Sequence, residues 1–333
     1  MKKRPFQHSA FSLICFMLSA CQGAGQADLP SKPQQALSSL CPTEFIILGA
    51  GQDAGAPQIG YTDDPAWTDP ALRLSATSAA LVHHKSGDRY LFEATPDISK
   101  QLQLLNTLSP SVNGSIGLSG IFLTHAHIGH YTGLMYLGRE AASTNNLPVY
   151  LMPRFKTFIE TNGPWAQLVT LGNIKPLPLK DRQTRSLGQG ISVMPYRVPH
   201  RDEYSETVGY IIKTAGKSVL FLPDIDDWDE WERAYDTRIE DLITQTDYAF
   251  IDATFFSDNE LGRDMSEIPH PRVEVSMDRF DHLPPNVKSR VHFIHYNHSN
   301  KIRYEDSDQT RSVIERGYNI ARAGNRFCLT ETR

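Results

Sequence analysis

Short apolar runs and longer amphipathic stretches alternate along most of the chain. The first run, residues 45–48, consists of four large apolar side chains, which is typical of a buried strand. Similar runs predict strands at residues 78–83, 90–93, 120–124, 148–152, 191–198, 208–213, 218–222, 248–252 and 291–295. Amphipathic stretches predict helices at residues 97–108, 130–142, 153–162, 228–245 and 307–317. Groups of strands with helices between them favour an α+β fold of layered sheets with helices outside. Since no internal repeat or second linker interrupts this pattern, we expect residues 41–333 to form one domain.

The first 40 residues have a different character. Lys2, Lys3 and Arg4 precede a short apolar run, which predicts a signal peptide over residues 1–20 and is too short for a permanent membrane span. The sequence Leu18-Ser19-Ala20-Cys21 resembles a bacterial lipobox, which implies a lipid anchor on Cys21; the alternative is an ordinary cleaved signal. Gln22 in place of Asp implies the outer membrane, with the protein facing the periplasm. Residues 21–40 are rich in Gln, Ala, Ser and Pro, which predicts a flexible tether.

Two cysteines remain outside the predicted signal and the lipobox. Cys41 and Cys328 lie near the two ends of the predicted domain. Outside the cytoplasm such a pair can form a disulfide, but two buried, unpaired thiols are an equal alternative.

The composition and charge exclude several classes of protein. The 333 residues are 40% hydrophobic and 21% charged, which is globular rather than disordered or coiled-coil. Three of the 33 basic residues lie in the predicted signal, so about 30 remain in the mature chain against 38 acidic residues. Nucleic-acid binders depend on clustered basic side chains, and we therefore expect a small-molecule substrate and no nucleic-acid partner.

A glycine-rich loop follows the first predicted strand. Residues 49–55 fit the loose dinucleotide-binding pattern, which requires a helix directly afterwards. Pro57, Pro65 and Pro70 follow instead, and proline breaks helix interiors. We expect a backbone loop that lines a pocket, and no nucleotide site.

The candidate chemistry lies in a cluster of histidines. His125, His127 and His130 follow the apolar strand at residues 120–123. His125 and His127 alternate along extended chain and so point the same way. Three imidazoles at a strand-to-helix turn suit Zn, Fe, Ni or Cu, whereas the alternative is a polar loop with incidental histidines.

The pattern His-x-His-x-Gly-His resembles the signature of the metallo-β-lactamase superfamily. Other superfamily motifs follow in order: the acid-rich stretch 93–97, Pro199-His200, the strand ending at Asp224, the stretch 251–255 and the strand ending at His295. Within the superfamily the chain is most similar to the pyrroloquinoline quinone biosynthesis protein B group, through residues 93–98, 130–134 and 293–300. The resemblance implies an αββα four-layer sandwich. It also implies metal ligands, namely His125, His127, His130, His200, Asp224 and His295. His298 is either a further ligand or a hydrogen-bonding loop residue, and the sequence favours neither.

One position departs from the family signature. Gly129 replaces the Asp that usually binds the second metal, so the resemblance implies one complete site and an incomplete second one. We expect one tightly bound metal, and we expect Gly129→Asp to strengthen the second site unless the backbone there forbids a side chain.

The resemblance implies hydrolysis of an ester, amide, lactone or phosphodiester bond by a metal-activated water. Asp224 and His295 are the candidate catalytic residues, Asp97 or Asp252 would orient ligand imidazoles, and His270 is expected in a pocket or a surface loop. Zn is the expected metal, with Mn or Fe as alternatives. Two other functions remain: oxidation or carriage of a quinone precursor, and small-molecule binding without catalysis.

Overall fold

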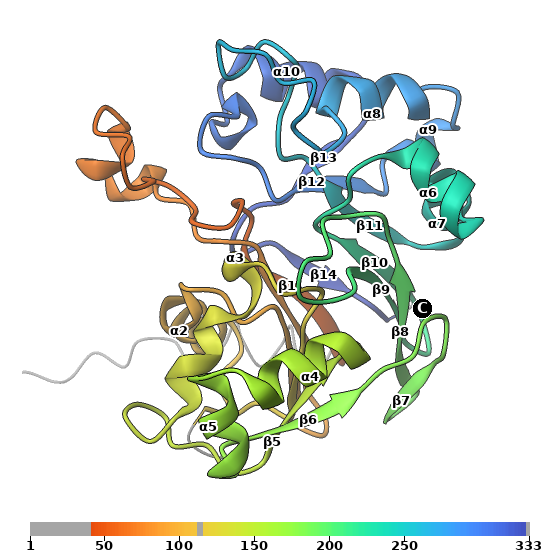
Figure 1. The fold of residues 1–333 in the computed structure, drawn as a ribbon. Helices are drawn as coiled ribbons and strands as arrows, with labels where there is room; N and C mark the ends of the chain where they lie inside the picture. Colours follow the sequence, from red (N-terminus) through yellow and green to blue (C-terminus); the bar gives the residue numbers. More distant parts are fainter. Residues whose placement is uncertain (1–40, 112–115, 331–333) are drawn as a thin grey trace, which may run out of the picture.

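The computed structural model describes residues 41–111 and 116–330, which form two seven-stranded sheets stacked face to face (Figure 1). The first sheet has the order β14-β1-β2-β3-β4-β5-β6 and the second β13-β12-β11-β10-β9-β8-β7. The first comprises β1 (Thr43–Gly49), β2 (Ser78–His83), β3 (Asp88–Phe92), β4 (Gly120–Phe122), β5 (Leu147–Leu151), β6 (Ile174–Pro178) and β14 (Arg326–Cys328). The second comprises β7 (Arg185–Gly188), β8 (Ile191–Arg197), β9 (Val208–Lys213), β10 (Ser218–Leu222), β11 (Tyr248–Asp252), β12 (Val291–Ile294) and β13 (Asn319–Ile320).

Helices cover the outer face of each sheet, which gives the expected four-layer sandwich. The first sheet carries α2 (Ile98–Leu108), α3 (Ile128–Tyr131), η3 (Thr132–Leu137), α4 (Pro153–Thr161) and α5 (Trp165–Thr170). The second carries α6 (Trp228–Tyr235), α7 (Ile239–Gln245), α8 (Val273–Phe280), α9 (Pro285–Lys288) and α10 (Asp308–Glu315). Three further 3-10 turns are η1 (Pro65–Trp67), η2 (Pro70–Leu72) and η4 (Lys301–Arg303).

The apolar runs of central strands such as β1, β2 and β10 are continuous because these strands are buried on both faces. In β1, Phe45 and Ile47 face the second sheet, whereas Ile46 and Leu48 face the helices on the outside. The Phe45 ring lies 6.0 Å from that of Phe221 and 5.3 Å from that of Phe250, so aromatic side chains join the two sheets. Side chains that alternate between two cores explain why the strand runs show no polar face.

Two predicted helices are interrupted in the structure. Residues 130–142 form one α-helical turn and then the 3-10 segment η3 rather than one helix. Gly133 donates its amide to Ala94 O at 2.8 Å, and a Cβ there would lie 2.1 Å from Thr95 O, so contact with the β3 loop shapes this segment. Residues 228–245 divide into α6 and α7 because Asp236 takes a left-handed conformation with φ 48°.

All ten predicted strands are present within two residues of their expected ends. The sequence analysis missed β6, β7, β13 and β14, together with α5, α8 and α9. Between β1 and β2 the chain forms only the turns η1 and η2, so the helix required by a dinucleotide site is absent from this described segment.

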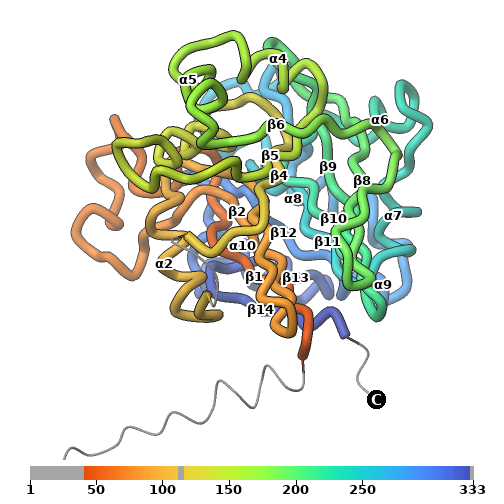
Figure 2. Tube along the Cα trace, turned by 90° about the horizontal axis from the view of Figure 1, so that it is seen from below, coloured from red at the N-terminus to blue at the C-terminus, as the bar shows by residue number. Residues whose placement is uncertain are grey.

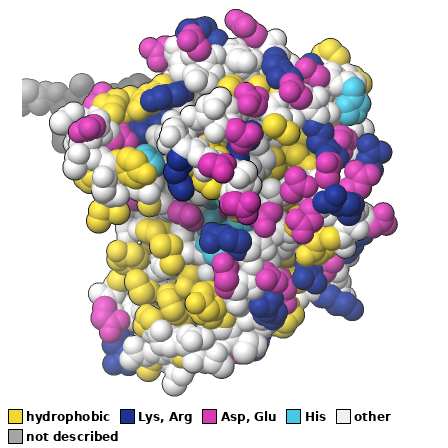
Figure 3. All heavy atoms as spheres, turned by 45° about the horizontal axis from the view of Figure 1, so that its top comes forward, with side chains coloured by type: hydrophobic (Ala, Val, Ile, Leu, Met, Phe, Trp, Pro, Cys, Tyr) yellow, Lys and Arg dark blue, Asp and Glu magenta, His cyan; other side chains and the backbone are white. Residues whose placement is uncertain are grey.

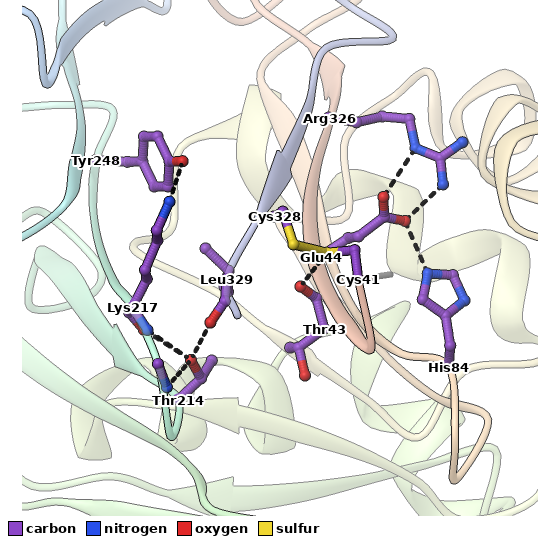
Figure 4. Close-up of a disulfide and its surroundings, with 11 residues drawn as sticks. Cys41, Thr43, Glu44, His84, Thr214, Lys217, Tyr248, Arg326, Cys328 and Leu329 are labelled. Carbon is purple, nitrogen blue, oxygen red and sulfur yellow. Dashed lines mark hydrogen bonds and ion pairs between the residues drawn. A yellow bond between two sulfur atoms is a disulfide. The ribbon is translucent and has the colours of Figure 1, made fainter. Parts of the chain in front are cut away.

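The first and last described residues lie side by side at one edge of the sandwich (Figure 2). Strand β14 pairs antiparallel with β1, and Glu44 is opposite Cys328. A disulfide joins Cys41 to Cys328, with a Cα–Cα distance of 5.7 Å (Figure 4). This decides in favour of the disulfide, one of the two alternatives that the sequence allowed.

The predicted signal peptide, Cys21 and the tether lie outside the described residues. Within the described ranges, no helix is long and apolar enough to cross a membrane.

Candidate metal centre

The ends of several strands place polar side chains at one edge of the two sheets. His125, His127 and His130 follow β4, His200 follows β8, Asp224 follows β10, and His295 follows β12. Strands β10, β11 and β12 are parallel, so their carboxyl ends lie together. In Figure 3, histidine side chains lie recessed on this face, partly covered by a basic side chain and flanked by acidic ones.

The first group contains three imidazoles. His125 Nε2 lies 2.8 Å from His127 Nδ1, which in turn lies 3.2 Å from His200 Nε2. All three ring atoms lie within 4.8 Å of one another, close enough to share one cation. The structure therefore brings together the three histidines expected in the first site.

The second group lies beside the first, and Asp224 connects them. Asp224 Oδ2 lies 3.2 Å from His130 Nε2 and 3.3 Å from His295 Nε2. The other carboxylate oxygen, Oδ1, lies 3.7 Å from His200 Nε2. Asp224 thus presents one oxygen to each group, as a bridging carboxylate does.

Several buried polar atoms in this site have no hydrogen-bond partner. They are His130 Nε2, His295 Nε2 and Asp224 Oδ2, together with Glu93 Oε1 and His130 Nδ1, on residues that are no more than 3% exposed. Leaving a buried donor or acceptor unsatisfied costs about 1–3 kcal/mol, and such atoms are rare in native proteins. Imidazole nitrogens and a carboxylate oxygen with no partner fit a divalent cation.

In each of the three rings of the first group, the nitrogen that faces away from the other two rings has a polar neighbour. His200 Nδ1 donates to Asp226 Oδ1 at 2.7 Å, His127 Nε2 lies 3.2 Å from Glu203 Oε2, and His125 Nδ1 lies 2.9 Å from Thr124 Oγ1. Such contacts fix the orientation of a ligand imidazole and raise its basicity. The sequence analysis missed both carboxylates, although Glu203 closely follows His200 in the chain and Asp226 closely follows Asp224.

Asp252, but not Asp97, is close to the site. Asp252 accepts hydrogen bonds from His270 Nδ1 at 2.7 Å and from Thr254 Oγ1 at 2.8 Å, and Thr254 Oγ1 lies 3.1 Å from His295 Nδ1. Asp97 instead accepts from Ala76 N and pairs with Lys100. The prediction that Asp97 orients a ligand imidazole is therefore wrong. Asp97 is the N-cap residue of α2, and its carboxylate contacts Ala76 N and Lys100 rather than a histidine.

Glu93, at the end of β3, takes the position beside a ligand imidazole. Its Oε1 lies 3.5 Å from His130 Nδ1, and its Oε2 accepts from Thr124 N at 3.3 Å. Glu93 has a φ of 70°, a left-handed conformation that few side chains adopt, so the surrounding structure must hold it there. Burial raises the pKa of Glu93 above its usual value.

His270 is buried in the site rather than in a surface loop. Its Nδ1 lies 3.9 Å from Asp224 Oδ1, and its ring centroid lies 5.3 Å from that of His200. Burial acts to lower the pKa of His270, but the Asp252 carboxylate outweighs it and raises the pKa. Its neighbours Pro269 and Pro271 gave no local pattern that could have identified it.

His298 is absent from the groups of possible ligand atoms within the described residues. Its ring packs on that of Tyr61 at 4.0 Å, which supports the alternative of a loop residue. Asp53, in the glycine-rich loop after β1, lies in the site instead, with Oδ1 3.5 Å from His130 Nε2.

The electrostatics of the site favour a positive charge. Burial acts to raise the pKa of Asp224, but the imidazoles of His295 and His130 hold it well below its usual value. Burial acts to lower the pKa of His130, yet the Asp224 carboxylate raises it well above the usual value. An ionised carboxylate among imidazoles is the environment that binds a divalent cation.

Two curated relatives, both described as coenzyme PQQ synthesis protein B, align with most of this chain. The protein from Methylococcus capsulatus is 26% identical over 319 residues, which cover 85% of this chain and 99% of the relative. The protein from Rhizobium meliloti is 27% identical over 315 residues, which cover 84% of this chain and 96% of the relative.

Solved structures show the same fold. Zn²⁺-bound PqqB from Methylobacterium extorquens matches with a TM-score of 0.69 and 21% identity, over 85% of this chain and 99% of that one. A diphosphatase from the PhnP family matches with a TM-score of 0.60 and 18% identity, over 86% and 96%. The family model described as a beta-lactamase superfamily domain matches residues 88–296, which is more than half of the chain. With its metallo-β-lactamase fold and the expected motifs on successive strand ends, the chain belongs to the beta-lactamase superfamily.

Proposed function

We propose that this protein is a metal-dependent hydrolase whose centre is formed by His125, His127, His200 and Asp224, with His130 and His295 beside them. The observation that carries the proposal is the convergence of ring nitrogens and carboxylate oxygens in two adjoining groups joined by Asp224, in which His130 Nε2, His295 Nε2 and Asp224 Oδ2 are buried without a hydrogen-bond partner. Imidazole with carboxylate suits Zn²⁺ first, and also Mn²⁺ or Fe²⁺.

The chain's own residues would hold and orient the reactants. A divalent cation in this site supplies a water of lowered pKa and polarises the bond under attack. Asp224 provides the negative charge between the two groups, while Asp226, Glu203 and Thr124 fix the three rings of the first group. His270, whose Nδ1 donates to Asp252 and lies 3.9 Å from Asp224 Oδ1, is the candidate to carry a proton at this site.

A phosphodiester is the first substrate class to test. The segment 251–255 resembles the phosphodiesterase-like branch of the superfamily, and in the structure its Asp252 and Thr254 contact His270 and His295. The fold is shared with a diphosphatase, which supports a phosphoryl substrate without identifying it.

The test uses the purified full chain, stripped of metal and reloaded with Zn²⁺, Mn²⁺ or Fe²⁺. We expect bound metal by mass spectrometry and turnover of a chromogenic phosphodiester in a panel that also contains a lactam and a lactone. His127→Ala should lose both, whereas His282→Ala, which alters an exposed histidine outside the site, should lose neither. A wild-type chain that binds none of the three metals would disprove the proposal.

A second candidate function rests on the relatives described as coenzyme PQQ synthesis protein B, which align with 84–85% of the chain. It is the metal-dependent oxidation, or the carriage, of a quinone precursor. Oxygen uptake by the Fe²⁺-loaded chain with a quinol, and no hydrolysis of any ester, would favour it. Binding of a small molecule without turnover would favour a non-catalytic role.

We also propose that the protein is exported and held by a lipid on Cys21, on the outer membrane and facing the periplasm. The basic, apolar and Leu-Ser-Ala-Cys order of residues 2–21 supports this. The disulfide between Cys41 and Cys328 supports it independently, since disulfides persist mainly in oxidising compartments.

A further inference from the structure

The glycine-rich loop after β1 reaches the position that Gly129 leaves without a ligand. Asp53 lies in this loop, and its Oδ1 is 3.5 Å from His130 Nε2. Asp53, His130 and His295 each offer one ligand atom, and these atoms lie within 4.8 Å of one another. A carboxylate and two imidazoles therefore face one another beside the first group of histidines.

The loop occupies the space that a side chain at position 129 would need. A Cβ on Gly129 would lie 2.3 Å from Asp53 Oδ1 and 2.4 Å from Asp53 Cα, distances that real Cβ atoms do not show. Gly129 itself is in helix α3 and is not at a positive φ, so its backbone conformation suits any residue. The glycine is required by the close approach of the loop, not by backbone geometry.

The loop is held firmly in this position. The backbone N–H of Gln52 donates to Tyr296 O at 3.0 Å, and the side-chain Oε1 of Gln52 accepts a hydrogen bond from Asn297 Nδ2. Thr77 Oγ1 donates to Gly51 O at 2.9 Å. Asp53 has a φ of 33°, a left-handed conformation of the kind that persists at functional sites when neighbouring contacts enforce it.

The atoms that face Asp53 have charged neighbours but no hydrogen bond among the described residues. His130 Nε2, His295 Nε2 and Asp224 Oδ2 are buried and make no hydrogen bond. Asp53 is 38% exposed on the side chain, so this group of ligand atoms is open to solvent on one side. Buried ligand atoms together with one solvent-accessible carboxylate fit a cation that can enter from solvent.

We propose that Asp53 supplies the carboxylate of a second divalent-cation position, together with His130, His295 and the shared Asp224. The loop after β1 then does what position 129 does in the family signature, and the centre binds two metals instead of one. The proposal rests on the proposed function only in that both require metal binding at this edge of the sheets.

The experiment measures zinc binding to the metal-free full chain, with stoichiometry from mass spectrometry and affinities from calorimetry. The wild type should bind two Zn²⁺ per chain. Asp53→Ala should keep one tight site and bind the second more than about 100-fold more weakly, since losing a ligand exceeds the 10–100-fold effect of an outer partner. Asp63→Asn removes one charge from an exposed position in the same segment and should leave both sites unchanged.

Two further variants guard against misfolding and test the steric argument. Asp53→Asn keeps the size of the side chain, so it decides the matter if Asp53→Ala unfolds. Gly129→Asp should weaken the second site, contrary to the expectation from the motif alone, because its Cβ would push the Asp53 loop away.

The outcomes separate this proposal from the proposed function. Unchanged stoichiometry and affinities in both Asp53 variants would overturn the role of Asp53, whether the wild type binds one zinc or two, and would leave the hydrolase proposal standing. A wild-type chain that binds no metal would overturn both.

Discussion

Removal of the disulfide should destabilise the fold strongly and leave the metal centre intact. Cys41 and Cys328 are 287 residues apart in sequence, so the bond constrains almost the whole unfolded chain. The loop-closure entropy for a loop of this length corresponds to about 5.7 kcal/mol, above the 2–4 kcal/mol that is typical of disulfides. We expect the double variant Cys41→Ser/Cys328→Ser to lose about 3–5 kcal/mol of unfolding free energy.

The folded state of this variant should survive because other contacts also hold β14 and Leu329 on β1 and on the turn before β10. Leu329 N donates to Thr43 O at 2.9 Å, Lys217 N donates to Leu329 O at 3.0 Å, and the Arg326 guanidinium pairs with the Glu44 carboxylate (Figure 4). These contacts remain when the sulfur–sulfur bond is gone. The destabilisation therefore arises from the greater conformational entropy of the unfolded chain without the cross-link.

The assay is urea unfolding followed by tryptophan fluorescence, at fixed metal concentration because bound metal shifts the equilibrium. With a slope of about 3 kcal/mol/M, the midpoint should fall by about 1 M or more. Reduced wild type should match the double variant. Metal content should not change, because the seven residues of β1 separate the disulfide from the site by about 20 Å at 3.3 Å per residue. If the oxidised wild type and the double variant unfold at the same urea concentration, or if the double variant loses bound metal, this reasoning is refuted.

Three further predictions concern the anchor and the metal centre. Cys21→Ser should abolish lipid labelling and membrane association, and labelling that persists would contradict the lipoprotein hypothesis. His127→Ala should lower the metal content sharply while circular dichroism stays unchanged, since His127 contributes one nitrogen to the first group; full occupancy with normal turnover would be the contrary result. Asp226→Ala should weaken metal binding about 10–100-fold, because the carboxylate orients His200 from 2.7 Å, and Asp226→Asn should retain more affinity. Equal affinities in wild type and both Asp226 variants would show that the contact does not matter.

The sequence by itself determined ten of the fourteen strands in the described residues and most of the polar residues at their ends. An apolar run buried on both faces is visible locally, and so is a histidine or aspartate directly after it, as at His125 and Asp224. The ordered motifs resemble those of the metallo-β-lactamase superfamily, and this resemblance predicted that these residues meet. Residues 78–83 and 218–222 are examples in which local pattern and final structure agree.

Only the tertiary structure decided the contacts between segments far apart in the chain. Asp53 was part of a weak glycine motif until the packing of the β1 loop against Gly129 put its carboxylate beside His130. His270 carried no periodic signal, and the disulfide depended on β14 pairing with β1 at opposite ends of the sequence. Periodicity reports what one segment buries, whereas the approach of two loops depends on sheet order and register, which no single segment encodes.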